Sequence, residues 1–140
     1  MHHKQRKSLF LLTCLIFSVI LCSCTICSCA KNKSPLLVQK KESVKEISIE
    51  SKDISLKTYK DEKDISTIIE YLNEAKWKAE SVNDVPDEKN YGTISLKMEK
   101  ETKKIYFYQK NKKNLLESPY IGVYKQTLSV ERLVKAIDAR

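Results

Sequence analysis

The sequence predicts an α+β fold in which two helices pack on an antiparallel sheet, with the elements in the order ββαββββα. Two observations predict it: several short segments alternate apolar and polar residues as strands do, and two segments repeat apolar residues at helical spacing. The 140 residues are 41% hydrophobic and 31% charged, which fits one folded domain and excludes a disordered chain or a polytopic membrane protein. We expect this domain at residues 46–140, behind an N-terminal signal or anchor helix at 1–23 and a flexible tether at 24–45.

The domain is expected to open with a β-hairpin. Ile47 and Ile49 alternate with polar residues in a first segment, and Ile54 and Leu56 do so in a second. The polar residues 51–53 between the two segments supply a turn. These alternations predict two short antiparallel strands.

A helix is predicted at residues 61–75. Its apolar residues recur at helical spacing: Ile65, Ile68, Ile69 and Leu72. Asp61 or Asp64 can cap the first free backbone amides, because a short carboxylate side chain accepts their hydrogen bonds. Trp77 follows directly, and we expect it to pack at the helix end.

A turn-rich loop around Pro86, at residues 80–90, leads to four further predicted strands. Alternation places them at residues 93–98, 105–109, 115–117 and 120–124. In the second of these strands, Ile105 and Phe107 share one face, while Tyr106 and Tyr108 point to the other.

A closing amphipathic helix completes the predicted order. Its apolar residues are Val130, Leu133, Val134 and Ile137. Either Thr127 or Ser129 can serve as its N-terminal cap.

The first 23 residues have the layout of an export signal. Lys4, Arg6 and Lys7 precede the uncharged apolar run Leu9–Leu21, and small and sulfur-containing residues follow. The cationic flank stays on the cytoplasmic side while the apolar run enters the bilayer, so that the chain behind it is carried across. We therefore expect the domain on the extracytoplasmic side of the cell membrane.

The residues behind the apolar run, Leu21-Cys22-Ser23-Cys24, resemble the lipobox of bacterial lipoproteins. In that family the thiol of a cysteine receives a diacylglycerol, the chain is cut just before this cysteine, and the lipid anchors the mature protein. The resemblance implies lipidation of Cys24, because the small Ser23 precedes it. Cys29 is the second choice, since it lies five residues deeper.

An uncleaved membrane span is the alternative. The 22 residues Leu9–Ala30 carry no charge and are long enough to cross about 30 Å of hydrocarbon, with the cysteines inert or carrying palmitate. Against this reading, residues 22–29 are Cys, Ser and Thr with a single Ile. This alternative predicts a single-span membrane protein with a structural role. Its domain would lie at the same location, on the extracytoplasmic side of the cell membrane.

Most of the net charge of +8 lies outside the predicted domain. Residues 46–140 hold 18 basic against 17 acidic residues, so we expect no nucleic-acid partner. All five cysteines fall within the first 29 residues, which excludes a disulfide or a Cys-based zinc site within residues 46–140.

The predicted domain itself carries a second resemblance. The segments NDVPDEKNYGTI, KKIYFYQK and NLLESPYIGVYK, followed by the closing helix, are similar to a small extracytoplasmic domain of unknown function in lipoproteins of Gram-positive bacteria. The most particular segment is SPYIGVY, at residues 118–124. This resemblance implies the fold and the location, and it supplies no catalytic residues.

The sequence contains no recognisable catalytic set. His2 and His3 are the only histidines and precede the domain, and Gly92 and Gly122 are the only glycines, which leaves no Gly-rich phosphate loop. We therefore expect no enzyme activity, no cofactor and no metal site.

Acidic residues in the loop at 80–90 offer the alternative. Asp84, Asp87 and Glu88 can serve a carboxylate-based envelope enzyme or bind Ca²⁺, although their spacing is not that of an EF-hand. A solvated loop is the simpler reading.

Tyrosines are the candidate binding residues. If Tyr106, Tyr108, Tyr120 and Tyr124 share an exposed sheet face, they form a platform for an unknown protein, peptide or glycan partner. Core packing beneath the helices is the competing role, and the more common one. With the lipid anchor, the sequence thus predicts a binding module at the membrane, with capture of a toxic peptide, as in immunity lipoproteins, or modulation of a membrane partner among its possible tasks.

Overall fold

Residues 44–140 of the protein are described by a computed structural model. The predicted signal segment 1–23, both candidate lipidation residues Cys24 and Cys29, and most of the predicted tether lie outside these residues. Val44 and Lys45, which the sequence placed in the tether, belong to the first strand.

Residues 44–140 form a seven-stranded sheet and two helices. The strands are β1 (Val44–Glu50), β2 (Lys57–Tyr59), β3 (Lys76–Ala79), β4 (Gly92–Met98), β5 (Thr102–Lys110), β6 (Lys113–Ser118) and β7 (Gly122–Gln126), and the helices are α2 (Glu62–Asn73) and α3 (Val130–Asp138). The predicted α+β class with an antiparallel sheet and two helices is confirmed.

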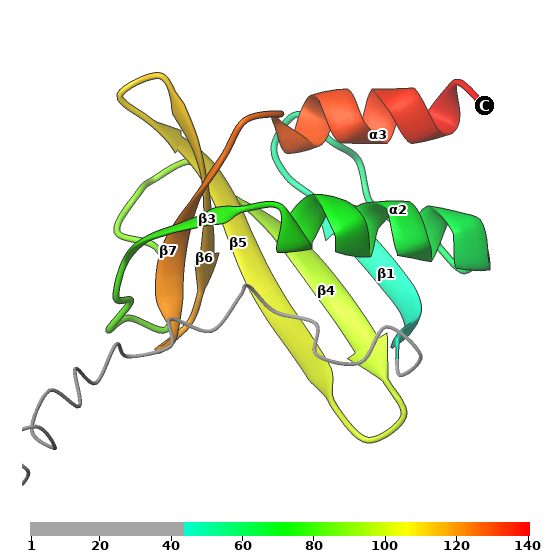
Figure 1. Ribbon diagram of the computed structural model, residues 1–140, viewed down its shortest axis with the longest axis horizontal. Helices are drawn as coiled ribbons and strands as arrows, with labels where there is room; N and C mark the ends of the chain where they lie inside the picture. The colour runs from blue at the N-terminus through cyan, green and yellow to red at the C-terminus, as the bar shows by residue number, and fades with distance from the viewer. Residues whose placement is uncertain (1–43) are drawn as a thin grey trace, which may run out of the picture. The chain divides into compact units, whose positions relative to one another are not determined.

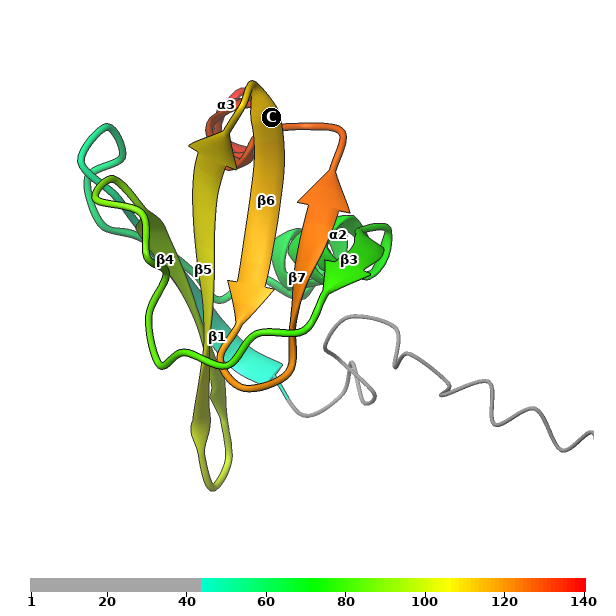
Figure 2. The same ribbon diagram turned by 90° about the vertical axis from the view of Figure 1, so that its left-hand side faces the viewer.

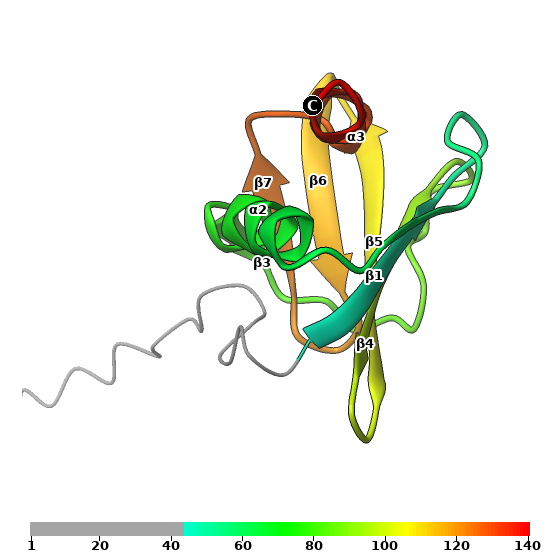
Figure 3. The same cartoon turned by 90° about the vertical axis from the view of Figure 1, so that its right-hand side faces the viewer.

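All neighbouring strands are antiparallel, in the order β2-β1-β4-β5-β6-β7-β3. Helices α2 and α3 lie on the same face of the sheet (Figures 1 and 3). Because strand directions alternate, β1 begins at the end where β4 turns into β5 and β6 turns into β7. This end points down in Figure 1, and it is called the lower end below.

The predicted element order was wrong by one strand. Residues Lys76–Ala79 form β3, which pairs with β7, whereas the sequence placed Trp77 at a helix end. Only two residues separate α2 from β3, and the pairing is interrupted between Trp77 and Ala79, so the short segment carries no clear alternation.

The second strand of the first hairpin is shifted along the chain. It comprises Lys57–Tyr59, and Ile54 is buried in the connecting loop. The Ser51 hydroxyl accepts hydrogen bonds from the backbone amides of Asp53 and Ile54, which holds the chain in a turn where a strand was expected.

Both helices begin at a predicted cap. The Asp61 carboxylate accepts hydrogen bonds from the backbone amides of Lys63 and Asp64, and the Ser129 hydroxyl accepts one from Arg132. Asp61 and Ser129 are therefore the caps, and Asp64 and Thr127 are not. Each side chain pairs an amide that has no partner within its helix.

The core lies between the sheet and the two helices. Ile68 and Leu72 of α2 are fully buried against Ile47, Ile94 and other apolar strand residues. Burying a side chain of this size stabilises a fold by about 1.5–3 kcal/mol. Among residues 44–140, no helix is long and apolar enough to cross a membrane.

Two hydrogen bonds connect α2 to the end of β7 and to the loop that follows β7 in the chain. The Tyr71 hydroxyl donates a hydrogen bond to the carbonyl of Leu128, over 2.9 Å. The side-chain amide of Gln126 donates one to the carbonyl of Tyr71. Burial raises the pKa of Tyr71, so the phenol keeps its proton and acts as a donor.

Candidate binding surface

The face of the sheet opposite the helices carries the predicted tyrosines of β5. In the antiparallel register, Tyr106 lies opposite Glu117 and Tyr108 lies opposite Leu115. Alternation puts all four side chains on this face, because Phe107 and Leu116 belong to the core beneath the helices.

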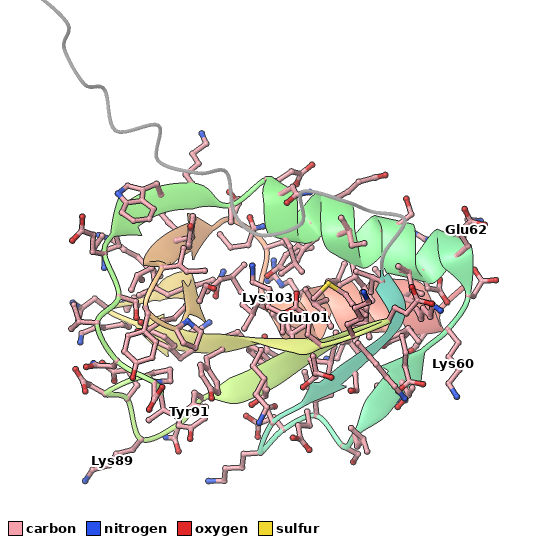
Figure 4. All side chains as sticks on the ribbon, turned by 90° about the horizontal axis from the view of Figure 1, so that it is seen from below. Lys60, Glu62, Lys89, Tyr91, Glu101 and Lys103 are labelled. Carbon is pink, nitrogen blue, oxygen red and sulfur yellow. The ribbon has the colours of Figure 1, made fainter. Side chains whose placement is uncertain are left out.

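A long connection crosses this face. Residues 80–91, called the crossing loop here, join β3 to β4, and three strands lie between these two in the sheet. Figure 2 shows the crossing loop in front of β5, β6 and β7, with the helices behind them. Figure 4 shows Lys89 and Tyr91 of the loop on the side of the sheet away from α2.

A buried carboxylate fixes the start of the crossing loop. The Ser81 hydroxyl donates a hydrogen bond to Glu117 Oε1 over 2.7 Å, and the Tyr108 hydroxyl donates one to Glu117 Oε2 over 2.9 Å. Ser81 is 6% exposed and Glu117 is 5% exposed. Burial and the hydrogen bond to Glu117 raise the pKa of Tyr108, which keeps the phenol a donor.

Three further contacts hold the rest of the loop. Lys110 Nζ lies 2.7 Å from Glu88 Oε1. The ring of Tyr91 packs edge-to-face on Tyr106, with 5.2 Å between the ring centroids. Closer to the lower end, a hydrogen bond with Asp84 raises the pKa of Tyr120. The crossing loop is thus attached to the sheet along its whole length.

The four predicted tyrosines do not form one platform. Tyr124 is 1% exposed, lies on the helix side and packs edge-to-face on Trp77. The register agrees with this position, because its partner Leu116 in β6 belongs to the core. Tyr124 is therefore not part of the predicted surface. Tyr106 is buried beneath Tyr91, Tyr108 is half-buried beside Glu117, and Tyr120 is exposed.

Tyr120 lies in the turn between β6 and β7. The backbone amide of Ile121 donates to the carbonyl of Ser118, with Pro119 and Tyr120 at the two central positions. Tyr120 has a φ of 56°, a left-handed conformation that such turns normally assign to glycine. Its side chain is 64% exposed.

The acidic residues of the loop act mainly as attachments. Asp84 contacts Tyr120 and Glu88 pairs with Lys110, while Asp87 lines a cavity of about 220 Å³ together with Glu88 and Glu117. Both oxygens of Glu117 accept hydrogen bonds from hydroxyls. No cluster of three potential metal ligands occurs in the described part of the chain.

A larger cleft, of about 440 Å³, lies at the upper end of the sheet. Its walls come from residues 51–53 after β1, the start of β4, the end of β5, the first half of β6, Tyr71 of α2 and the start of α3. Polar side chains dominate its rim, among them Ser51, Asn90, Gln109 and Asn114, and Tyr91 from the end of the crossing loop adds an aromatic ring.

The sequence analysis missed Ser81 and Glu117 as partners. They lie 36 residues apart, and only the strand register brings them together. One signal was available: Glu117 shares a strand face with the apolar Leu115, two residues earlier, and a carboxylate at such a position needs a buried partner.

Comparisons with known proteins found a family and a solved structure of similar fold. Residues 32–125 match the family DUF5301, described as "Domain of unknown function (DUF5300)". A solved structure titled "NMR structure of the protein from Ruminococcus gnavus" is similar at 28% sequence identity with a TM-score of 0.63, over 69% of this chain and 96% of that one. No curated protein matches the chain. Since the family match spans more than half of the sequence, the chain belongs to the DUF5301 family.

Proposed function

We propose that the protein is a lipoprotein anchored through Cys24, whose domain binds a ligand or partner on the extracytoplasmic side of the cell membrane. The observation that carries the binding role is the cleft of about 440 Å³ at the upper end of the sheet. Val44, where the chain from the anchor enters the domain, lies at the lower end. The cleft is thus at the opposite end of the sheet from Val44.

The dimensions and the walls of the cleft support a binding role. Pockets for small ligands span about 300–1,000 Å³ and carry a few well-placed polar groups. Here amide and hydroxyl side chains and the ring of Tyr91 line the cleft together with the charged Lys52, Asp53 and Glu131. Such a lining offers hydrogen-bonding partners to the polar groups of a peptide or a glycan.

The crossing loop supports the same role from its far end. Its last residues, Asn90 and Tyr91, line the cleft, and its first residues are fixed to Glu117. A loop that is already ordered loses less conformational entropy when a ligand binds. Binding residues are often found on loops that a rigid scaffold positions in this way.

The anchoring part of the proposal rests on the sequence. Cys24 follows an apolar run and a small residue, and residues 46–140 contain no cysteine. An uncleaved span at Leu9–Ala30 is the alternative to a lipid anchor, and a carboxylate-based envelope enzyme is the alternative to a binding module. The cavity shared by Asp87, Glu88 and Glu117 is the place for such an enzyme site.

Fatty-acid labelling tests the anchor. Cells that express the full chain are grown with a labelled fatty acid, and the parent is compared with Cys24→Ala and Cys29→Ala. We expect label in the parent and in Cys29→Ala, and neither label nor processing in Cys24→Ala. Label that survives in Cys24→Ala but disappears in Cys29→Ala would move the anchor to Cys29.

Thermal unfolding tests the cleft. The full chain in detergent is screened against neutral oligosaccharides and short peptides, together with Gln109→Ala at the cleft and Lys63→Ala on α2 as a matched surface control. A ligand of the cleft should raise the melting temperature of the parent and of Lys63→Ala, and raise it less in Gln109→Ala. Equal shifts in all three proteins would count against the cleft.

A further inference from the structure

Lysines form a continuous row across four neighbouring strands, on the face of the sheet opposite the helices. Lys110 of β5 lies opposite Lys113 of β6, and Lys125 of β7 lies opposite Lys76 of β3. Lys113 and Lys125 are diagonal neighbours, because Lys125 lies opposite Leu115 and Lys113 precedes Leu115 by two residues. All four lysines are exposed and share the face of Leu115. Lys76, Lys110, Lys113 and Lys125 are called the basic stripe below.

The basic stripe lies at the upper end of the sheet. Lys113 begins β6 and Lys125 precedes the last residue of β7, so both lie in the upper parts of these strands. Figure 2 shows the crossing loop in front of the lower parts of β6 and β7, and no segment in front of their upper parts. Neighbouring strands are about 4.8 Å apart, so the stripe extends about 14 Å across the sheet. A row of this length can meet several charged groups of an extended chain.

Folding does not explain the basic stripe. Like charges directly opposite each other on neighbouring strands destabilise a sheet, and the stripe contains two such pairs. Within residues 44–140, the stripe has a single ion pair, between Lys110 and Glu88. Lysine on an edge strand prevents aggregation, which accounts for Lys76. Since β6 and β7 are interior strands, Lys113 and Lys125 need another role.

The turn between β5 and β6 adds a further lysine in an unfavourable conformation. Asn111 and Lys112 have φ values of 52° and 60°, as in a type I′ hairpin turn, whose second position normally belongs to glycine. A lysine there is less favourable for folding than glycine, because its Cβ atom is crowded in the left-handed region. Lys112 is exposed between Lys110 and Lys113, and it increases the positive charge at this end of the stripe.

The chemistry of the stripe favours a phosphate-bearing chain over a peptide or a protein. Peptide and protein interfaces depend on apolar or aromatic anchors. Within residues 44–140, no exposed large apolar side chain belongs to the four strands of the stripe. Ammonium groups act as point charges, and two of them can donate to different oxygens of one tetrahedral phosphate. The opposed lysine pairs supply ammonium groups in this arrangement.

Two other polyanions fit the surroundings less well. A flat bilayer that approached this face would meet the crossing loop, which carries four acidic residues against the single Lys89. Single-stranded nucleic acids bind through stacking of their bases on aromatic rings. Tyr91 and Tyr120, the exposed tyrosines of residues 44–140, lie outside the four strands. A narrow chain without bases can follow the stripe and pass beside the crossing loop.

We propose that the basic stripe binds an extended polymer with a phosphate group in each repeat and no bases, such as a polyol phosphate or a sugar phosphate chain. The ammonium groups donate to phosphate oxygens, and the release of counterions from the polymer favours association. This surface goes beyond the proposed function, because none of its lysines lines the cleft and it does not require the lipid anchor.

Acetylation of lysine side chains tests the location. The full chain in detergent is treated briefly with an amine-acetylating reagent, with and without inorganic polyphosphate, and mass spectrometry gives the rate at each lysine. With polyphosphate, we expect the rates at Lys113 and Lys125 to fall at least threefold. The exposed Lys63 of α2 and Lys135 of α3 are the controls and should not change. Rates at Lys113 and Lys125 that fall no more than those of the controls overturn the proposal.

Two charge-matched double variants test the energetics. Lys113→Gln with Lys125→Gln removes two charges from the stripe, and Lys63→Gln with Lys135→Gln removes two from the helices. Labelled polyphosphate should bind the stripe variant at least fivefold more weakly than the parent, and the helix variant within twofold. The slope of log affinity against log salt should fall by about 1.4 in the stripe variant, since each phosphate contact contributes about 0.7. Equal affinities of the two variants contradict the proposal.

The choice of polymer is tested with three competitors at equal concentration of charged groups. They are polyglutamate, a single-stranded oligothymidylate, and phosphatidylglycerol vesicles that replace the detergent. Polyphosphate should slow acetylation at Lys113 and Lys125 more than each competitor does. Equal or greater protection by one competitor contradicts the phosphate chain and assigns the stripe to that class of partner.

The melting temperature of the stripe variant tests the claim that folding does not explain these lysines. At low salt it should equal or exceed that of the parent, because the opposed positive charges no longer repel each other. A lower melting temperature would assign Lys113 and Lys125 a structural role and contradict the proposal.

Discussion

Different interactions stabilise the two faces of the sheet. On the helix side, fully buried apolar residues such as Ile47, Ile94 and Leu72 belong to one hydrophobic core. On the other side, the crossing loop is held by a few separate contacts, of which the hydrogen bonds to Glu117 are the most buried. The first face determines whether the domain folds, and the second determines where one loop lies.

Truncation of the core should give the largest effect. Leu72→Ala removes a fully buried side chain beneath the sheet, and we expect a loss of about 3 kcal/mol in the free energy of unfolding. Urea titration measures this loss. Val82→Ala on the exposed crossing loop is the control, with an expected change below about 0.5 kcal/mol. Similar losses in both variants would remove the contrast between the two faces.

Glu117 is the corresponding test of the second face. Glu117→Ala leaves the hydroxyls of Ser81 and Tyr108 without their acceptor, and we expect a loss of about 2 kcal/mol. Glu117→Gln keeps one acceptor oxygen and should cost about half as much.

The location of this effect is more informative than its size. Hydrogen exchange in residues 80–91 should accelerate in Glu117→Ala, while α2 and β1 keep most of their protection. Uniform acceleration across the domain would show that Glu117 supports the whole fold instead of the loop.

Alkaline pH should weaken both faces. Burial, together with Asp138, raises the pKa of Tyr59 to about 12, and the pKa of Tyr108 is raised by burial and by Glu117. A phenol whose pKa is higher in the folded state stabilises the fold fully below its ordinary value of 10.0, and this stabilisation is lost as pH rises from there through the folded-state pKa.

Unfolding in urea at several pH values checks this direction. The midpoint should fall above about pH 10, and Tyr59→Phe and Tyr108→Phe should each make the fall less steep. Tyr120, which is exposed, provides the comparison, since Tyr120→Phe should change the profile least. A parent midpoint that stays constant up to about pH 12 would contradict the assignment.

The smallest effect is expected at a helix cap. Ser129→Ala removes the acceptor for the backbone amide of Arg132 at the start of α3, which should cost about 1 kcal/mol. Ser129→Asp should restore most of this loss. The free energy of unfolding from urea titration is again the measure, and a loss as large as that in Leu72→Ala would show that the cap also supports the core.

The sequence was sufficient for features that depend on neighbours along the chain. Helical spacing from Ile65 to Leu72 and a capping side chain at Asp61 are local, so α2 was predicted within two residues at each end. The strand faces of β4 and β5 were predicted for the same reason, because alternation depends only on adjacent residues.

Features that depend on register were not predictable. Tyr124 was grouped with Tyr120 in a strand predicted at residues 120–124, but Tyr120 belongs to a turn and β7 begins only at Gly122. The contact between Ser81 and Glu117 depends on how β3, β7 and β6 align. No local pattern contains that information.

The cleft at the upper end teaches the same lesson for function. It collects side chains from segments that are distant in sequence, from residues 51–53 to residues 129–131.

Intact-mass spectrometry of protein extracted from its native membrane tests the central claim most directly. A lipoprotein anchored through Cys24 should give the mass of a chain that begins at Cys24, increased by a diacylglycerol on its sulfur. A mass that retains the initiator methionine and carries no acyl group would contradict the lipid anchor and would favour the uncleaved span at Leu9–Ala30.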